Sequence, residues 1–229
     1  MRGGIDAVFA TSWETAYPSF RDPSPARRLY FVQDFEPFFY PVGTESVLAE
    51  NTYRFGFTGI TAGGWLASKL ADEYGMTTRS FDFSADRTAY RRLDDAPRKE
   101  IFFYARPATA RRGFALGVMA LDLFSRARPE YVINFAGEDV SRQSIPFAYK
   151  NLGAMPVDKL NGLYNRCAAG LVLSLTNMSL LPLGLLSAGR PPRRHDPPHN
   201  TTEFHQPCLH GPAPPPPGLS PSTPPACPR

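Results

Sequence analysis

Residues 171–183 read Leu-Val-Leu-Ser-Leu-Thr-Asn-Met-Ser-Leu-Leu-Pro-Leu, and this stretch decides the fold. Its first part is a continuous apolar run, which predicts a strand over residues 170–175, buried on both faces of a parallel sheet. Small polar residues then interrupt the run, and a helix-like apolar segment follows with Pro182 near its start. Open α/β sheets bind ligands at such turns beyond the carboxyl ends of strands, and a helix start suits a phosphate.

The preceding chain alternates between strand-like and helix-like patterns. Strands are expected at residues 7–10, 29–34, 57–60, 101–105 and 131–135, and helices at 44–53, 63–74, 114–124 and 157–167. The polar, arginine-rich residues 82–97 predict a linker between two α/β units. Alternating strands and helices imply right-handed crossovers and parallel sheets.

The chain changes character after Gly189. All four histidines and more than half of the 25 prolines lie in residues 190–229, which show no apolar periodicity. We expect this segment to be disordered with extended, Pro-rich character. It lacks the repeated P-x-x-P core of an adaptor tail. His205 and Cys208 have no second pair at zinc-site spacing, so no metal site is expected there.

The charge and composition of the chain limit the classes of function that it can have. A net charge of +4, carried mainly by arginine, permits an anionic ligand. No basic run is interleaved with stacking aromatics, so we expect no nucleic-acid partner. The apolar stretch at residues 170–186 is short and interrupted, which predicts no transmembrane segment. Cys167 has no histidine in the folded part to activate it, so a thiol nucleophile is not expected.

A basic turn between a strand and a helix is the first candidate site. Arg106 directly follows the predicted strand, and Arg111 and Arg112 precede the predicted helix. Three guanidinium groups at one turn suit a diphosphate, because arginine binds phosphate oxygens bidentately. The alternative is that Arg111 and Arg112 belong to a solvated helix face.

Two carboxylates form the second candidate site. Asp34 and Glu36 lie at the end of a predicted strand, where a carboxylate can act as a general base or bind sugar hydroxyls. The alternative is turn capping or an ion pair. Nearby aromatic residues could stack on a sugar face or belong to the core: Trp13, Tyr17, Phe38, Phe39 and Tyr40.

Several blocks together resemble one family. They are residues 31–41 (Phe-Val-Gln-Asp-Phe-Glu-Pro-Phe-Phe-Tyr-Pro), 52–56, 64–66, 103–107 with Arg111 and Arg112, and 173–183. In order and spacing they resemble the rhamnan-synthesis type of rhamnosyltransferase, bacterial enzymes of GT-B fold related to glycosyltransferase family 4. The resemblance runs from about residue 6 to about residue 189.

The resemblance implies two Rossmann-like domains with the active site in the cleft between them. Residues 1–97 would be the end of the N-terminal, acceptor-side domain with the linker, residues 98–189 part of the C-terminal, nucleotide-sugar-binding domain, and residues 190–229 the disordered tail. The donor would be a dTDP-sugar, typically dTDP-rhamnose, and the acceptor a cell-surface polysaccharide. Neither metal nor cofactor is implied, since protein cations stabilise the leaving diphosphate. The enzyme would be cytoplasmic, or attached peripherally at the inner membrane surface.

The resemblance also assigns residues. Asp34 and Glu36 would lie near the cleft as catalytic groups. The donor-binding residues would be Arg106, Arg111 and Arg112 on the diphosphate and Thr176, Asn177, Met178 and Ser179 in the nucleotide-sugar pocket.

Three departures from the family pattern modify this expectation. By this resemblance, the chain would begin inside the acceptor-side domain. Where relatives carry a Glu-x7-Glu pattern, this chain has Thr176 and Gly184. From Arg190 on, arginine and proline replace a valine strand, as a frameshift in a GC-rich gene would produce. The sequence therefore leaves two expectations: a deoxysugar transferase, or a non-catalytic, truncated remnant with weak or no nucleotide-sugar binding.

Overall fold

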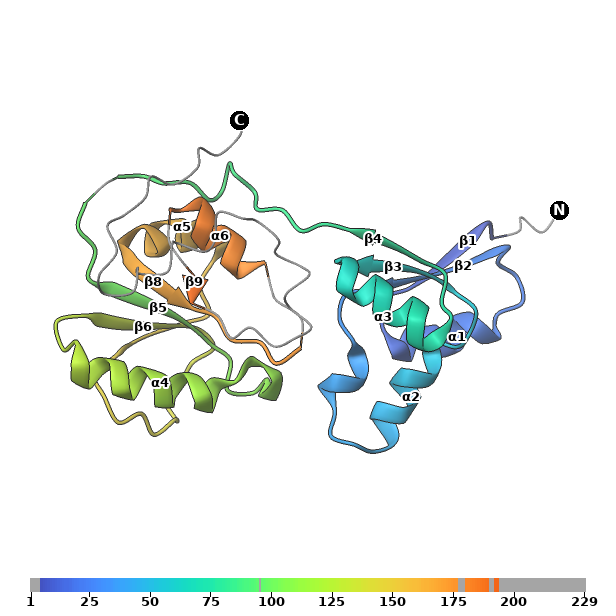
Figure 1. Cartoon of the computed structure of the whole chain (residues 1–229), viewed down its shortest axis with the longest axis horizontal. Helices are drawn as coiled ribbons and strands as arrows, with labels where there is room; N and C mark the ends of the chain where they lie inside the picture. Colours follow the sequence, from blue (N-terminus) through green and yellow to red (C-terminus); the bar gives the residue numbers. More distant parts are fainter. Residues whose placement is uncertain (1–4, 95, 177–179, 190–191, 194–229) are drawn as a thin grey trace, which may run out of the picture.

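The computed structural model describes residues 5–94, 96–176, 180–189 and 192–193, and in them the chain builds two parallel sheets joined by an extended segment (Figure 1). The first sheet has the order β1-β2-β3-β4, with β1 (Ala7–Ala10), β2 (Arg27–Val32), β3 (Thr58–Ala62) and β4 (Thr78–Phe81). The second has the order β7-β6-β5-β8-β9, with β5 (Glu100–Ala105), β6 (Val132–Gly137), β7 (Lys150–Gly153), β8 (Cys167–Leu171) and β9 (Pro192–Arg193). We call residues 5–81 the N-terminal half and residues 100–193 the C-terminal half.

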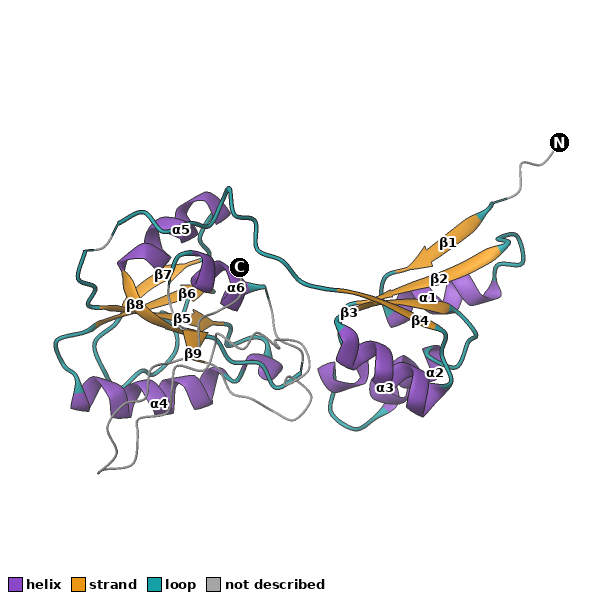
Figure 2. Cartoon of the chain, turned by 45° about the horizontal axis from the view of Figure 1, so that its top comes forward, coloured by secondary structure: helices purple, strands orange, loops and turns teal. Residues whose placement is uncertain are grey.

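Helices cover these sheets (Figure 2). The N-terminal half carries α1 (Trp13–Arg21), the 3-10 helix η1 (Glu36–Phe39), α2 (Thr44–Thr52) and α3 (Gly64–Tyr74). The C-terminal half carries the 3-10 helix η2 (Ala110–Arg112), α4 (Phe114–Ala127), α5 (Val157–Arg166) and α6 (Leu181–Ser187). Alternate residues of β5 point to opposite sides: Phe103 packs in the cluster that includes Leu121 of α4, and Phe102 in the cluster that includes Leu163 of α5. The second sheet is therefore covered on both faces, as buried parallel sheets are.

The first core lies between β2 and the helices of the N-terminal half. Tyr30 and Val32 of β2 are fully buried there with Leu66 and Leu70 of α3. Helix α3 ends at Gly75, whose φ of +66° is the left-handed conformation that favours glycine at this position. The predicted stop of this helix is thus confirmed.

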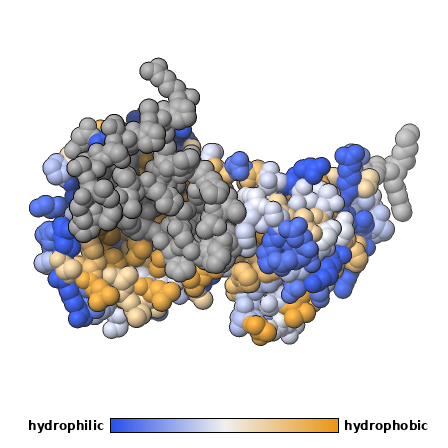
Figure 3. Space-filling model, in the orientation of Figure 1, coloured by the Kyte–Doolittle hydropathy of each residue, from blue (hydrophilic) through white to orange (hydrophobic). Residues whose placement is uncertain are grey.

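Helix α4 is apolar on its outer face as well as toward the sheet. Leu116, Met119 and Leu123 are exposed at helical spacing, and Figure 3 shows apolar side chains over this element.

The predicted α/β class with parallel sheets is confirmed, but the deciding strand is shifted. Strand β8 starts at Cys167 and ends at Leu171, so the prediction of a strand over residues 170–175 is wrong in its bounds. Val172 is still fully buried, and the N–H of Leu175 donates to the carbonyl oxygen of Arg111. The apolar run thus indicates that these residues are buried. It does not indicate a strand, because a loop packed on the core is buried as well.

Among the described residues, the sequence patterns do not predict α1, β4, β7 and β9, nor the 3-10 helices η1 and η2. Helix α1 contains Pro18, and β4 is mostly exposed. Strand β9 pairs Pro192 and Arg193 with Gly170 and Leu171 of β8, so the expectation of disorder from Arg190 is wrong for these two residues. The rest of the predicted disordered tail lies outside the described residues.

Candidate functional site

Two adjoining cavities lie at the carboxyl edges of the two sheets. The larger, of about 800 Å³, is lined by residues at or just after the ends of all four strands of the first sheet and by Arg111 and Arg112. The smaller, of about 560 Å³, is lined by residues that end β5 and β6 or follow β5 and β7, by the linker and by the start of α6. Ser84 and Leu180 line both cavities, so the two spaces meet.

Asp34 joins the two halves of the molecule. It follows β2, is 5% exposed, and its Oδ2 accepts a 2.7 Å hydrogen bond from the hydroxyl of Thr176 in the C-terminal half. The N–H of Phe35 donates to its Oδ1 at 2.8 Å. Burial raises the pKa of Asp34, although these hydrogen bonds and the charges of Arg111 and Arg112 oppose the shift. This carboxyl is fixed at the junction of the halves.

Glu36 is a buried carboxyl in the wall of the larger cavity. Its Oε2 accepts the backbone N–H of Trp13 at 2.8 Å, and its Oε1 accepts the hydroxyl of Tyr30 at 3.0 Å. Its own backbone N–H donates to the hydroxyl of Tyr53 at 3.0 Å. Burial raises the pKa of Glu36 to about 7 in spite of both side-chain hydrogen bonds. A carboxyl with this pKa can exchange a proton near neutral pH.

The three arginines of the basic turn are divided between the cavities. Arg106 lines the smaller one, while Arg111 and Arg112 lie in η2 ahead of α4 and line the larger one. All three are half-buried, and Arg111 and Arg112 belong to η2 rather than to a solvated helix face. Binding of one diphosphate by all three remains a prediction.

Each arginine has a defined anchor. Arg106 donates to Glu138 Oε1 at 2.5 Å and to the hydroxyl of Tyr104 at 3.0 Å. Arg112 donates to Ser174 Oγ at 3.1 Å. These contacts fix each guanidinium while leaving further N–H groups, since a guanidinium carries five.

Arg111 is held by an aromatic ring from the other half. Its guanidinium lies 4.0 Å from the centroid of the Phe39 ring, a cation–π contact. Its Nε has no hydrogen-bond partner among the residues that the structure describes.

The predicted donor pocket at residues 176–179 is described only at Thr176, which is bound to Asp34. Asn177, Met178 and Ser179 lie outside the described residues.

The aromatic residues near the carboxylates divide between cavity and core. Trp13, Phe39 and Tyr40 line the larger cavity, and Trp13 Nε1 donates to the Tyr40 hydroxyl at 2.9 Å. Tyr17 packs edge-on against Phe55 instead, in keeping with the core alternative.

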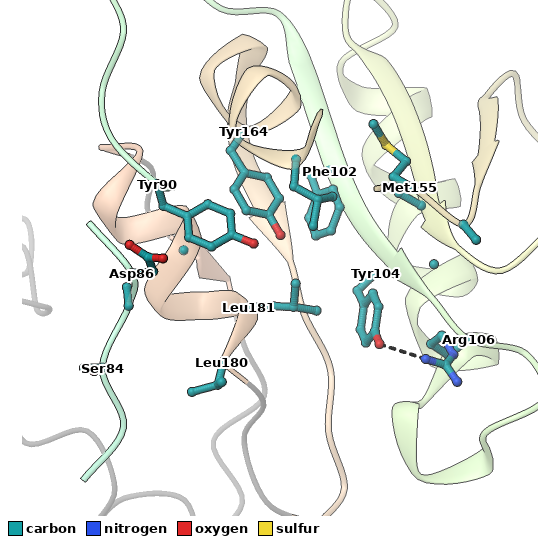
Figure 4. A pocket seen from close by; sticks show the side chains of 16 residues that line it. Ser84, Asp86, Tyr90, Phe102, Tyr104, Arg106, Met155, Tyr164, Leu180 and Leu181 are labelled. Atoms are coloured by element: carbon teal, nitrogen blue, oxygen red, sulfur yellow. Dashed lines mark hydrogen bonds between the residues drawn. The ribbon is translucent and has the colours of Figure 1, made fainter. Parts of the chain in front are cut away.

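The smaller cavity contains residues that sequence reasoning missed (Figure 4). Its wall includes Tyr90 of the linker, Tyr104 of β5 and Tyr164 of α5. Glu138, which orients Arg106, was also missed, although an acidic residue directly after a strand end is a signal that could have found it. Gly184 of α6 lines the same cavity.

Other functional classes have few residues to support them. Cys167 is buried in an apolar cluster, and burial raises the pKa of its thiol to about 12. The described part of the chain contains no group of three or more His, Cys, Asp or Glu that could hold a metal ion. Among its helices none has the length and apolar character needed to cross a membrane.

Comparison with known structures identifies the fold. The chain resembles the structure of sucrose-phosphate synthase from Thermosynechococcus elongatus with a TM-score of 0.65 and 10% sequence identity, over 82% of this chain and 55% of that one. This likeness, together with the two parallel sheets, shows that the chain has the GT-B fold, in which two α/β halves face each other across a cleft.

Sequence comparison finds similarity to a family model and to a bacterial relative. Residues 99–191 match the family model described as WsaF, C-terminal domain. The chain is also 36% identical over 190 residues to the O-antigen biosynthesis protein RfbC of Myxococcus xanthus. That alignment covers 80% of this chain and 15% of RfbC, so the chain spans a small part of this relative.

Proposed function

We propose that this chain carries the donor and catalytic sites of a glycosyltransferase that transfers a sugar from a nucleotide diphosphate to a polysaccharide. The observation that carries the proposal is the pair of adjoining cavities at the carboxyl edges of both sheets, where α/β proteins bind ligands. One cavity holds Arg106 among aromatic residues, and the other is lined by Asp34, Glu36, Arg111 and Arg112. The likeness to RfbC, named for O-antigen biosynthesis, supports the polysaccharide acceptor.

The smaller cavity suits the nucleotide part of the donor. Its walls are mainly aromatic and apolar, as a base and sugar require. Arg106 lies beside the Tyr104 ring, held by Glu138, with N–H groups left for a phosphate. The finer assignment, from the family resemblance, is dTDP-rhamnose.

The larger cavity suits the reacting sugar and the acceptor hydroxyl. The acceptor oxygen bonds to the anomeric carbon while the bond from that carbon to the diphosphate oxygen breaks. Glu36 takes the proton that the acceptor hydroxyl loses, a role that its pKa of about 7 favours. Arg111 and Arg112 stabilise the leaving diphosphate, so this mechanism uses protein cations and no metal. The hydrogen bond between Asp34 and Thr176 holds the two halves together.

Gly184 favours a second candidate, a chain that binds the donor without transferring its sugar. The family pattern has a carboxylate where α6 carries this glycine, and the rings of Tyr90 and Tyr164 lie against it instead. Such a chain would bind a nucleotide sugar and leave it unchanged in the presence of any acceptor.

The test measures release of deoxythymidine diphosphate (dTDP) from dTDP-rhamnose, with and without a rhamnose-terminated acceptor. We expect acceptor-dependent release that falls about a hundredfold or more in Glu36→Gln. Glu130→Gln, at an exposed carboxylate paired with Arg128, should keep the wild-type rate. Donor binding without release would favour the second candidate, and absence of donor binding would contradict both.

A further inference from the structure

One buried hydroxyl in the described part of the C-terminal half has no hydrogen bond there. Tyr164 of α5 is fully buried, and its hydroxyl has no partner among the residues that the structure describes. Leaving a buried donor unpaired costs free energy, so native proteins rarely do it without a reason. A phenylalanine would fill the same space without that cost.

The unpaired hydroxyl belongs to the wall of the smaller cavity. Tyr164 lines this cavity, and Figure 4 shows its oxygen pointing toward the space between Tyr90 and Leu181. The ring is held edge-on against Phe102, with centroids 5.1 Å apart. Burial raises the pKa of the Tyr164 hydroxyl well above its ordinary value, so it stays protonated and able to donate.

Gly184 makes room for this arrangement. A Cβ at this position would lie 3.3 Å from a ring carbon of Tyr164 and 3.5 Å from the ring of Tyr90. The glycine therefore leaves room for the Tyr164 ring, which a side chain at this position would crowd.

The linker places a second ring against Tyr164. Tyr90 stacks on Tyr164 with centroids 5.8 Å apart and an interplanar angle of 26°. The chain just after it is clamped to α5: Arg91 N–H donates to Asn161 Oδ1 at 3.1 Å, and Leu93 N–H donates to Asn165 Oδ1 at 2.9 Å. The backbone of the linker is thus fixed on the C-terminal half, while the Tyr90 ring is partly exposed.

We infer that the Tyr164 hydroxyl is a specificity-determining hydrogen-bond donor for the nucleoside part of the ligand. The inference rests on the proposed function and adds a residue to it. When the Tyr90 ring turns aside, a ribose hydroxyl or a base carbonyl oxygen can reach the Tyr164 oxygen and satisfy it. Arg106 binds the phosphates in the same cavity, so the nucleoside and the diphosphate contact different residues.

Calorimetric titration with two probes tests this division. Tyr164→Phe should weaken dTDP binding about tenfold or more, since it removes one buried hydrogen bond to the ligand. The same variant should bind inorganic pyrophosphate as the wild type does, whereas Arg106→Ala should weaken both probes. Tyr149→Phe, which removes the hydroxyl of a partly buried tyrosine outside both cavities, is the matched control and should bind both probes normally.

Thermal melting separates a binding role from a packing role. Without ligand, Tyr164→Phe should melt at the wild-type temperature or higher, because it removes an unpaired hydroxyl. A lower melting temperature with unchanged dTDP affinity would show a packing role and overturn the inference. Equal dTDP affinity in wild type and Tyr164→Phe would overturn this inference and leave the proposed function standing. Absence of dTDP and dTDP-rhamnose binding by the wild type would overturn the proposed function and, with it, this inference.

Discussion

Glu36 makes stability depend on pH in a direction opposite to that of an ordinary surface carboxylate. Burial raises its pKa to about 7 from 4.5, and the side chain is 6% exposed. A folded-state pKa above the unfolded one means that the folded chain binds the proton more tightly. The stabilisation that this proton gives the folded state is fully present below about pH 4.5 and is lost as the pH rises through about 7. The size of the pKa difference corresponds to about 3 kcal/mol of unfolding free energy.

The substitution Glu36→Gln isolates this contribution. Glutamine is neutral and similar in shape, and its carbonyl oxygen can still accept the N–H of Trp13. At pH 5, where most folded wild-type molecules have Glu36 protonated, the two proteins should differ by less than about 1 kcal/mol. At pH 8 the variant should be more stable by up to about 3 kcal/mol, because the wild type must bury a charge.

Urea denaturation at pH 5 and pH 8 measures this effect as the free energy of unfolding. Glu130→Gln is the control. Its free energy of unfolding, relative to that of the wild type, should not rise between pH 5 and pH 8. If the wild type and Glu36→Gln differ by the same amount at both pH values, the raised pKa of Glu36 is refuted.

Three further substitutions test other contacts. Thr176→Val removes the hydrogen bond to Asp34 and should lower the free energy of unfolding by about 1.5–3 kcal/mol. A double-mutant cycle with Asp34→Ala, which also removes the acceptor, that gives no coupling would contradict this contact. Gly117→Ala places a Cβ against the Phe103 ring and should lower the free energy of unfolding by about 1–3 kcal/mol. An unchanged free energy of unfolding would contradict this close packing. Arg106→Ala should weaken dTDP binding about tenfold by calorimetry, and unchanged affinity would remove Arg106 from the site.

The elements that could be predicted have signals in their own residues. Strand β1 is a short apolar run, and α3 combines helical spacing with a glycine stop. The edge strands β4 and β7 have few buried residues, and they form because β3 and β6 offer a partner. Pairing of this kind depends on the tertiary fold, which local patterns do not contain.

Site prediction from sequence had a similar limit. Charged residues at strand ends, such as Asp34 and Arg106, can be recognised because ligands bind at that edge. The pairing of Asp34 with Thr176 joins residues far apart in the chain, and spacing alone does not indicate it. Tyr164 reads as a core residue of an amphipathic helix, since nothing local shows that its hydroxyl is unpaired.

A crystal structure of the chain with dTDP-rhamnose tests the central claim most directly. We predict one bound molecule, with its nucleoside in the smaller cavity beside Tyr104, its diphosphate within hydrogen-bond distance of Arg106, and its sugar at the entrance to the larger cavity near Glu36. A ligand bound away from both cavities, or crystals that remain without it at saturating concentration, would contradict this account.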